Sequence, residues 1–254
     1  MNAKKPIPHG IWLIISFSAA ILLWIVISIS EKGGVVFAPP WKVVEKLIAE
    51  GYDGILWTHI GYSLFRLITG FALGFVFSIP VAFLMGWYAP VRHVVGPWFR
   101  FIRHIPPLAY IPLVAVGAGA GERAKVIVIA IASFLAMVVT IYQGILNVNT
   151  DLIRAARTSG AGNRDLFFKA VVPSSVPFIF AGARLGLSSS LTTLVAAELT
   201  GASKGLGAMV QKASGSYDMA SVLLGIIIIG LIGMGLDKII RFLEKRLTGV
   251  SGGL

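Results

Sequence analysis

The sequence predicts an all-α, polytopic membrane protein with six transmembrane helices. Of its 254 residues, 56% are hydrophobic and only 13% are charged, whereas soluble domains carry about 25% charged residues. Its mean hydropathy is +0.85. The length accommodates roughly six apolar segments of about 20 residues with their connections. Because the bilayer core offers no water to backbone amides, such segments must be helices. We expect one membrane domain, residues 1–254.

Six apolar segments, each bounded by polar or charged residues, are the predicted spans. They cover residues 11–29, 60–88, 105–120, 126–146, 174–199 and 220–240. The first segment follows Lys4 and Lys5, as the apolar region of a signal peptide would. It is longer than such a region usually is, and no small-x-small cleavage site precedes Glu31. We therefore expect it to remain as the first span.

The connection between the first two spans, residues 31–58, is predicted to lie outside the bilayer. It contains Pro39 and Pro40, followed by an amphipathic pattern from Trp41 to Glu50. This pattern is typical of a short helix lying along the membrane interface, with Trp41 as its anchor.

The third span is short and interrupted by prolines at positions 106, 107 and 112. Proline lacks a backbone donor and bends a helix. At membrane depth such a break is tolerated only where it is packed in protein or lines a cavity. Glycines at 117, 119 and 121 follow, and they predict a tight exit from the bilayer.

Basic residues in the connections predict a multi-pass protein of the cell membrane, inner or plasma, with both termini in the cytoplasm. Positive residues collect in cytoplasmic loops, and with the N-terminus inside, 13 Lys and Arg residues lie on the cytoplasmic side against 7 outside. The inside set is Lys4, Lys5, Arg92, Arg100, Arg103, Arg154, Arg157, Arg164, Lys169, Lys238, Arg241, Lys245 and Arg246. A net charge of +11 could indicate nucleic-acid binding. However, these residues are spread through short loops and form no stripe, so we expect no nucleic-acid partner.

The longest cytoplasmic loop, residues 147–173, is patterned for two short helices. Thr150 is placed to cap a helix that starts at Asp151. Gly160 is placed to end this helix in a left-handed conformation. Asn163 is then expected to cap a second helix over 164–171, and Pro173 to begin the next span.

Small residues in this loop leave the backbone bare, so that another surface could approach closely. They are Ala155, Ala156, Gly160, Ala161 and Gly162. From the pattern alone the loop is either an ordinary amphipathic connector or a docking surface.

The segment Ala155-Ala156-Arg157-Thr158-Ser159-Gly160, followed by Val171-Val172-Pro173, resembles the EAA loop of membrane subunits of binding-protein-dependent ABC importers. That motif reads Glu-Ala-Ala-x-x-x-Gly and ends in a hydrophobic-Pro pair about a dozen residues later. In the family, this loop supplies a coupling helix that sits in a groove of the ATPase subunit. Arg154 occupies the position of the family's glutamate, so no contact through that carboxylate is expected.

Further segments resemble one branch, the nitrate, sulfonate and taurine permeases. They are Ser63-Leu64-x-Arg66 with Gly70, Pro106-Pro107-Leu108-Ala109 with Ile111-Pro112-Leu113, Gly182-x-Arg184-Leu185, and Ala196-Ala197-Glu198 with Gly205-Leu206-Gly207. The resemblance covers about residues 12–245 and implies a type I ABC importer permease fold. It also implies a second copy of this chain, two cytoplasmic ABC ATPase subunits and an extracytoplasmic solute-binding protein. The implied substrate is a small anion such as a sulfonate, taurine or nitrate.

Three ionisable residues are expected inside the spans, Arg66, Arg184 and Glu198. Each costs about 2.5–3.5 kcal/mol at a helix centre, so none should face lipid. Arg66 and Glu198 lie at comparable depth and could pair, either as a structural lock or as part of a gate or pathway.

Arg184 lies ten residues from the cytoplasmic end of the fifth span. It either lines the pathway, where it would favour anions, or bonds to the backbone at a helix break. Ser188 and Thr192 belong to a polar run on the same span. Such residues serve helix packing or line a pathway, and both interpretations stay open.

No catalytic or metal site is predicted. His9 and His59 are isolated, and His93 and His104 flank a basic loop without zinc-motif spacing. The chain lacks GxxxxGK[ST], so ATP and Mg²⁺ are expected to bind a partner ATPase and no cofactor to bind this chain. The alternatives are an ion-coupled secondary transporter and a non-transporting membrane scaffold. The first would need acidic residues at the bilayer midplane, where only Glu198 is available, near one edge.

Overall fold

The computed structural model describes residues 9–30, 33–119 and 121–248, and all regular structure within these ranges is helical. Five helices are long and apolar enough to cross a membrane, and a bent pair of helices makes a sixth. The predicted helical membrane fold is therefore confirmed. Several residues used in the predictions, Lys4, Lys5, Glu31, Lys32 and Ala120, lie outside the described residues.

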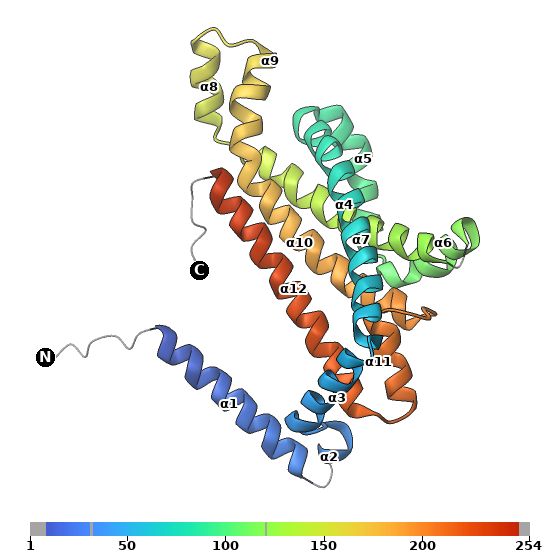
Figure 1. The fold of residues 1–254 in the computed structure, drawn as a ribbon. Helices are drawn as coiled ribbons and strands as arrows, with labels where there is room; N and C mark the ends of the chain where they lie inside the picture. Colours follow the sequence, from blue (N-terminus) through green and yellow to red (C-terminus); the bar gives the residue numbers. More distant parts are fainter. Residues whose placement is uncertain (1–8, 31–32, 120, 249–254) are drawn as a thin grey trace, which may run out of the picture.

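The first span is the helix α1 (His9–Ile29), which stands apart from the bundle (Figure 1). Its apolar side chains are mostly exposed, as expected for a helix surrounded by lipid or another apolar surface. Beyond it, α2 (Gly33–Val36) leads into α3 (Pro40–Tyr52). The Trp24 indole donates a hydrogen bond of 3.0 Å to the Ala38 carbonyl and fixes this corner.

The helix α3 confirms the amphipathic pattern predicted after Pro39. Pro40 opens its first turn, a position where the missing N–H of proline does no harm. Lys46 forms an ion pair of 2.6 Å with Asp218, just before the last helix. The hydrogen bond to Asp218 raises the pKa of Lys46 above its usual value. The pair anchors α3 to the bundle.

Three long helices form the core, α4 (Ile55–Trp87), α7 (Glu122–Leu146) and α10 (Val172–Leu199). They approach closely at small residues. A Cβ on Gly74 would overlap Ser133 of α7, and a Cβ on Gly186 would lie 2.6 Å from a carbon of Met137. Contacts through small residues are typical of helix packing inside membranes.

The third predicted span, residues 105–120, is broken as its prolines indicate, but it is only the second part of a longer bent segment. The chain instead forms α5 (Ala89–Ile102), the 3₁₀ turn η1 (Pro107–Ala109) and α6 (Tyr110–Ala118), with α5 bent by 85° from the pair that follows. A nine-residue helix is too short to cross a bilayer alone. The prolines at 106 and 107 explain the bend, and the Tyr110 hydroxyl holds it by donating to the Ile102 carbonyl at 2.9 Å.

The first helix predicted in the loop 147–173 is present, but its cap differs from the prediction. The helix α8 (Thr150–Thr158) is capped by the Asn149 side chain, which accepts from the Asp151 N–H at 2.8 Å, and not by Thr150. Gly160 ends the segment with φ +84°, so its predicted left-handed conformation is confirmed.

The second predicted helix of this loop is not separate from the next span. The short α9 (Asn163–Asp165) runs through a π-helical segment, η2 (Leu166–Val171), directly into α10. Asn163 is therefore a helical residue, not a cap, and Pro173 lies within one rod from Asn163 to Leu199. The proline is accommodated because its missing N–H follows wider π-helical turns, where the regular hydrogen-bond ladder is already interrupted.

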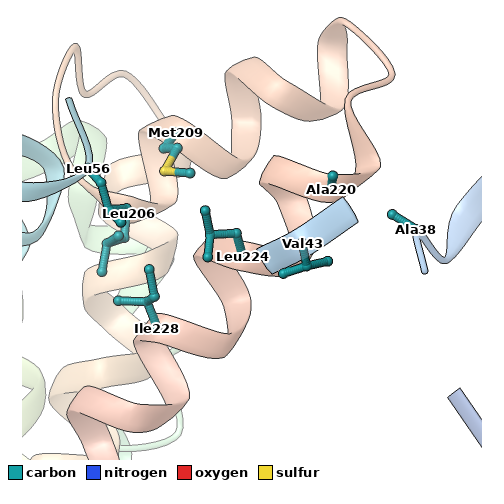
Figure 2. Packing of buried hydrophobic residues seen from close by; sticks show 8 residues of the cluster. All are labelled: Ala38, Val43, Leu56, Leu206, Met209, Ala220, Leu224 and Ile228. Atoms are coloured by element: carbon teal, nitrogen blue, oxygen red, sulfur yellow. The ribbon is translucent and has the colours of Figure 1, made fainter. Parts of the chain in front are cut away.

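The chain ends with the short α11 (Leu206–Gly215) and the long α12 (Met219–Thr248). Leu56, Leu206 and Leu224 are among the residues that pack them together (Figure 2). The helix α12 continues eight residues past the predicted end of the sixth span. Arg241, Lys245 and Arg246, which were expected in the polar segment after the sixth span, therefore lie on a helix.

Candidate functional site

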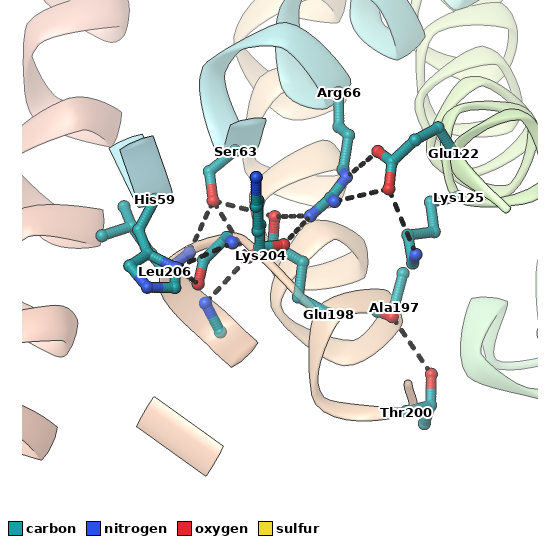
Figure 3. Close-up of polar contacts among 12 residues, drawn as sticks. His59, Ser63, Arg66, Glu122, Lys125, Ala197, Glu198, Thr200, Lys204 and Leu206 are labelled. Carbon is teal, nitrogen blue, oxygen red and sulfur yellow. Dashed lines mark hydrogen bonds and ion pairs between the residues drawn. The ribbon is translucent and has the colours of Figure 1, made fainter. Parts of the chain in front are cut away.

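The predicted pair of Arg66 and Glu198 is present, and both side chains are completely buried (Figure 3). Arg66 Nη1 lies 2.6 Å from Glu198 Oε1 and 2.7 Å from the Lys204 carbonyl. The other edge of the guanidinium binds Glu122, with Nη2 2.7 Å from Oε1. One arginine of α4 thus joins α7, α10 and the loop after α10.

Glu198 has a partner for each carboxylate oxygen. Besides Arg66, its carboxylate accepts from the Ser63 hydroxyl at 2.8 Å and from the Gly207 N–H at 2.7 Å. The Ser63 oxygen in turn accepts from the Leu206 N–H at 2.8 Å. These two N–H groups begin α11, where a helix favours negative charge. Glu198 therefore fixes the start of α11 as well as pairing with Arg66.

The charges of this site balance within the protein. Lys125 Nζ lies 3.4 Å from Glu122, so two acids face two bases. A buried ion pair must recover the desolvation of both charges through good geometry and further hydrogen bonds. Both conditions hold here. Within the described ranges, no three acidic or histidine side chains are grouped to hold a metal ion.

Gly205 lets the loop after α10 close over the ion pair. Its φ is +126°, and a Cβ there would lie 2.5 Å from Glu198 Cδ and 2.6 Å from Arg66 Nη1. His59 Nδ1 lies 3.0 Å from the Gly205 nitrogen and 2.9 Å from its oxygen. His59, which is isolated from the other histidines in the sequence, thus bonds to backbone, because the loop folds back onto the start of α4.

We expect Gly205→Ala to destabilise the protein by about 2–5 kcal/mol, from left-handed strain and overpacking together. Gly201→Ala is the matched control, because Gly201 also has a positive φ (+134°) but nothing within 4 Å of a built Cβ. Thermal unfolding in detergent micelles, followed by tryptophan fluorescence, measures both. Equal shifts for the two variants would show that the Cβ contacts with the ion pair contribute nothing.

Among the described residues, Arg184 pairs with acidic side chains and not with backbone at a helix break. Its Nε lies 3.6 Å from Asp237, and its Nη1 lies 3.5 Å from Glu244, both on α12. Asp237 also accepts from Arg241 at 2.7 Å. About a third of the Arg184 side chain remains exposed. This second cluster joins α10 to α12 at the end of the molecule that carries α8.

The polar run on α10 divides between two faces. Ser190 and Thr193 are buried, and Ser189 donates to the Ala132 carbonyl of α7 at 3.2 Å. Ser188 and Thr192 are exposed. The Thr192 hydroxyl donates to the Ser188 carbonyl of its own helix at 3.1 Å. Ser189 thus bonds across the helix interface, the buried Ser190 hydroxyl has no hydrogen-bond partner among the described residues, and Ser188 and Thr192 face away from the protomer.

The small residues of the loop 147–173 are accessible, as Figure 1 shows for the projecting α8. Ala155, Gly160 and Gly162 are exposed, and Ala156 and Ala161 are half-buried. No atom lies within 4 Å of a Cβ built on either glycine. Arg154 is exposed and pairs weakly with Asp151 at 3.6 Å, and Pro173 is exposed on the rod. The loop therefore presents a bare backbone surface beyond the bundle.

Residues 70–249 match the family described as binding-protein-dependent transport system inner membrane component. A probable ABC transporter permease of Brucella melitensis is 42% identical over 98% of this chain and 99% of its own length. The taurine transport system permease protein of Escherichia coli K12 is 35% identical, over 98% of this chain and 93% of its own. Among solved structures, a chain of the inward-facing MetNI methionine ABC transporter has a TM-score of 0.65 at 19% identity, and covers 80% of this chain and 99% of its own. This last likeness concerns the fold.

Proposed function

Because the chain belongs to the family of binding-protein-dependent transport system inner membrane components, we propose that two copies of it form the solute pathway of an ABC importer. The family consists of membrane subunits without a catalytic site of their own, so ATP and Mg²⁺ would bind two copies of a cytoplasmic ATPase. An extracytoplasmic solute-binding protein would deliver the substrate. Both termini would lie in the cytoplasm, as the distribution of basic residues indicates.

One observation carries this proposal, the rod that runs without interruption from Asn163 to Leu199. Its 37 residues correspond to about 55 Å at 1.5 Å per residue. One end adjoins the exposed loop with Gly160 and Gly162, and the other carries Glu198. A displacement of the loop would therefore reach the Arg66 cluster through a single helix. A scaffold without transport would need neither the bare loop nor the connection.

We assign the loop residues Arg154, Ala155, Ala156, Gly160, Ala161, Gly162 and Pro173 to ATPase docking and coupling. ATP binding would draw the ATPase subunits together and carry the two loops with them. The spans would then move between inward-open and outward-open arrangements around the dimer axis. In this mechanism Arg66 and Glu198 hold the outer ends of α4, α7 and α10 as one unit.

The proposed substrate is a small anion such as a sulfonate, taurine or nitrate. The taurine permease relative supports this class, since taurine carries a sulfonate. Ser188 and Thr192 lie on the exposed face of α10, where a second copy would place them along a shared pathway. Arg184 is near the same face and would favour anions. An ion-coupled transporter is less consistent with the structure, because Glu198 is already fully hydrogen-bonded.

Cysteine accessibility tests the orientation and the docking together. The chain has no native cysteine, and Ser159 and Ser203 are both exposed. A cysteine at Ser159 should react with a membrane-impermeant maleimide from the cytoplasmic side only, and should be protected when the cognate ATPase is co-expressed. A cysteine at Ser203, the control, should react from the outside with or without the ATPase. Labelling of both from one side contradicts the orientation, and an unprotected Ser159 position contradicts the docking.

A further inference from the structure

A cavity of about 640 Å³ lies between the last turns of α4 and the start of the rod, apart from the Arg66 cluster and from the exposed glycines. Its walls are largely aromatic. Trp87 and Phe167 meet edge to face with ring centroids 5.0 Å apart, and Phe83 meets Phe167 at 5.6 Å. These edge-to-face contacts hold the rings of the wall against one another.

The mouth of the cavity combines exposed apolar surface with a positive charge. Phe168 is 61% exposed and Tyr88 is 52% exposed. Arg164 lines the same cavity and is exposed, and no carboxylate of the described residues is within ion-pair distance of it. The neighbouring Asp165 carboxylate forms an ion pair of 2.6 Å with Lys169 instead. An exposed apolar patch with polar residues at its rim marks an interaction site.

The position of the cavity points to the membrane boundary. Tyr88 is the last residue of the predicted second span, and Arg164 belongs to the polar segment outside the bilayer. Trp and Tyr side chains concentrate at the level of the lipid headgroups. A molecule bound at this level contacts aromatic side chains and bilayer lipid on one side and the Arg164 cation on the other.

We propose that this cavity binds an anionic phospholipid, with its acyl chain against Trp87, Phe167 and Phe168 and its phosphate at Arg164. Basic pockets between membrane helices on the cytoplasmic side bind such headgroups, and this is the cytoplasmic end in the orientation proposed above. One wall is η2, which joins the exposed loop to α10. The bound lipid therefore bridges α4 to the rod and makes the stiffness of that junction depend on lipid composition.

Native mass spectrometry of the full-length protein tests the site, after equilibration in mixed micelles with equal amounts of phosphatidylglycerol and phosphatidylcholine. The wild type should retain more phosphatidylglycerol than phosphatidylcholine. In Arg164→Gln the ratio of the two retained lipids should fall at least threefold. Phe168→Ser should lower the retention of both lipids. Arg246→Gln, which removes an exposed charge from the last turn of α12, is the matched control and should behave as wild type.

Equal retention of the two lipids by the wild type would overturn the proposal, as would an unchanged preference in Arg164→Gln. If Arg164→Gln keeps the lipid preference but no longer co-purifies with the cognate ATPase, the surface belongs to the ATPase and the lipid site is refuted. The proposed importer function does not depend on either result, because docking at Ser159 and uptake are measured separately.

Discussion

Replacing Arg66 with methionine should lower the unfolding temperature of the protein by roughly 6–20 °C, since removal of one partner of a buried ion pair costs about 3–5 kcal/mol. The change leaves the Glu198 carboxylate, with its side chain fully buried, without a cation. It also frees Glu122, whose side chain is 42% exposed and can be solvated. The larger share of the loss should therefore come from Glu198. Thermal unfolding in detergent micelles measures it.

A double-mutant cycle separates the two carboxylates. Arg66→Met combined with Glu198→Gln should be less destabilised than the sum of the single changes by about 1–3 kcal/mol, because residues in one buried network couple this strongly. The matched cycle with Glu122→Gln should show a smaller coupling, as expected for a half-exposed partner. Additive effects in the Glu198 cycle would mean that the pair does not stabilise the fold, whatever its geometry.

The structure also changes the expectation for removing Glu198 alone. In an isolated pair with Arg66, Glu198→Ala would leave an uncompensated buried cation. In the structure Arg66 keeps Glu122 and the Lys204 carbonyl, so the arginine is the more sensitive member of the pair. Glu198→Ala should still release the start of α11, because the Gly207 N–H loses its acceptor.

The core of this site could be predicted because burial of charge in a membrane is so unfavourable. Arg66 and Glu198 lie at equal depth in apolar segments, and each needs an opposite charge there. Glu122 could not be predicted in the same way. It opens α7 at the end of a polar connection, where a carboxylate usually faces water. Only the three-dimensional placement of α7 beside α4 turns its side chain toward Arg66.

In the spans too, local chemistry predicted where a helix is disturbed, but packing decides where each helix begins and ends. Prolines at 106 and 107 predicted a break, but not that residues 89–102 before it form a helix, because Arg92 and Arg100 resemble loop charges. Pro173 predicted the start of a span, and the π-helical turns before it allow a continuous rod instead. The proposed docking role of the loop could be tested only with a second chain, since it requires a partner surface.

Gly162→Trp should leave the protein inserted and folded but reduce ATP-dependent uptake by roughly ten- to hundredfold, since overpacking a close interface costs about 1–3 kcal/mol. Gly162 has an ordinary backbone conformation, φ −71° and ψ 165°, and a Cβ there meets nothing within 4 Å. The indole therefore costs little in the isolated subunit. A loss of uptake must then arise where the loop meets the ATPase.

Gly160 and Arg154 supply the companion variants. Gly160→Trp should reduce uptake at least as much as Gly162→Trp, because φ +84° also penalises any side chain there. Gly160→Asn controls for that strain, since asparagine tolerates the left-handed region and is far smaller than tryptophan. Arg154→Glu, which restores the glutamate of the ABC importer motif, should be tolerated because the side chain is 79% exposed.

The measurement is uptake and stimulated ATP hydrolysis in vesicles reconstituted with the cognate ATPase and binding protein, at matched protein levels. Uncoupling by tryptophan at either glycine, with activity kept by Gly160→Asn and Arg154→Glu, would assign the effect to lost docking and not to local strain. Wild-type uptake by Gly162→Trp would mean that the loop is a connector with free space around it. The proposed coupling contact would then have to lie elsewhere, and the part of α12 in which Asp237 and Glu244 bind Arg184 would be the next place to test.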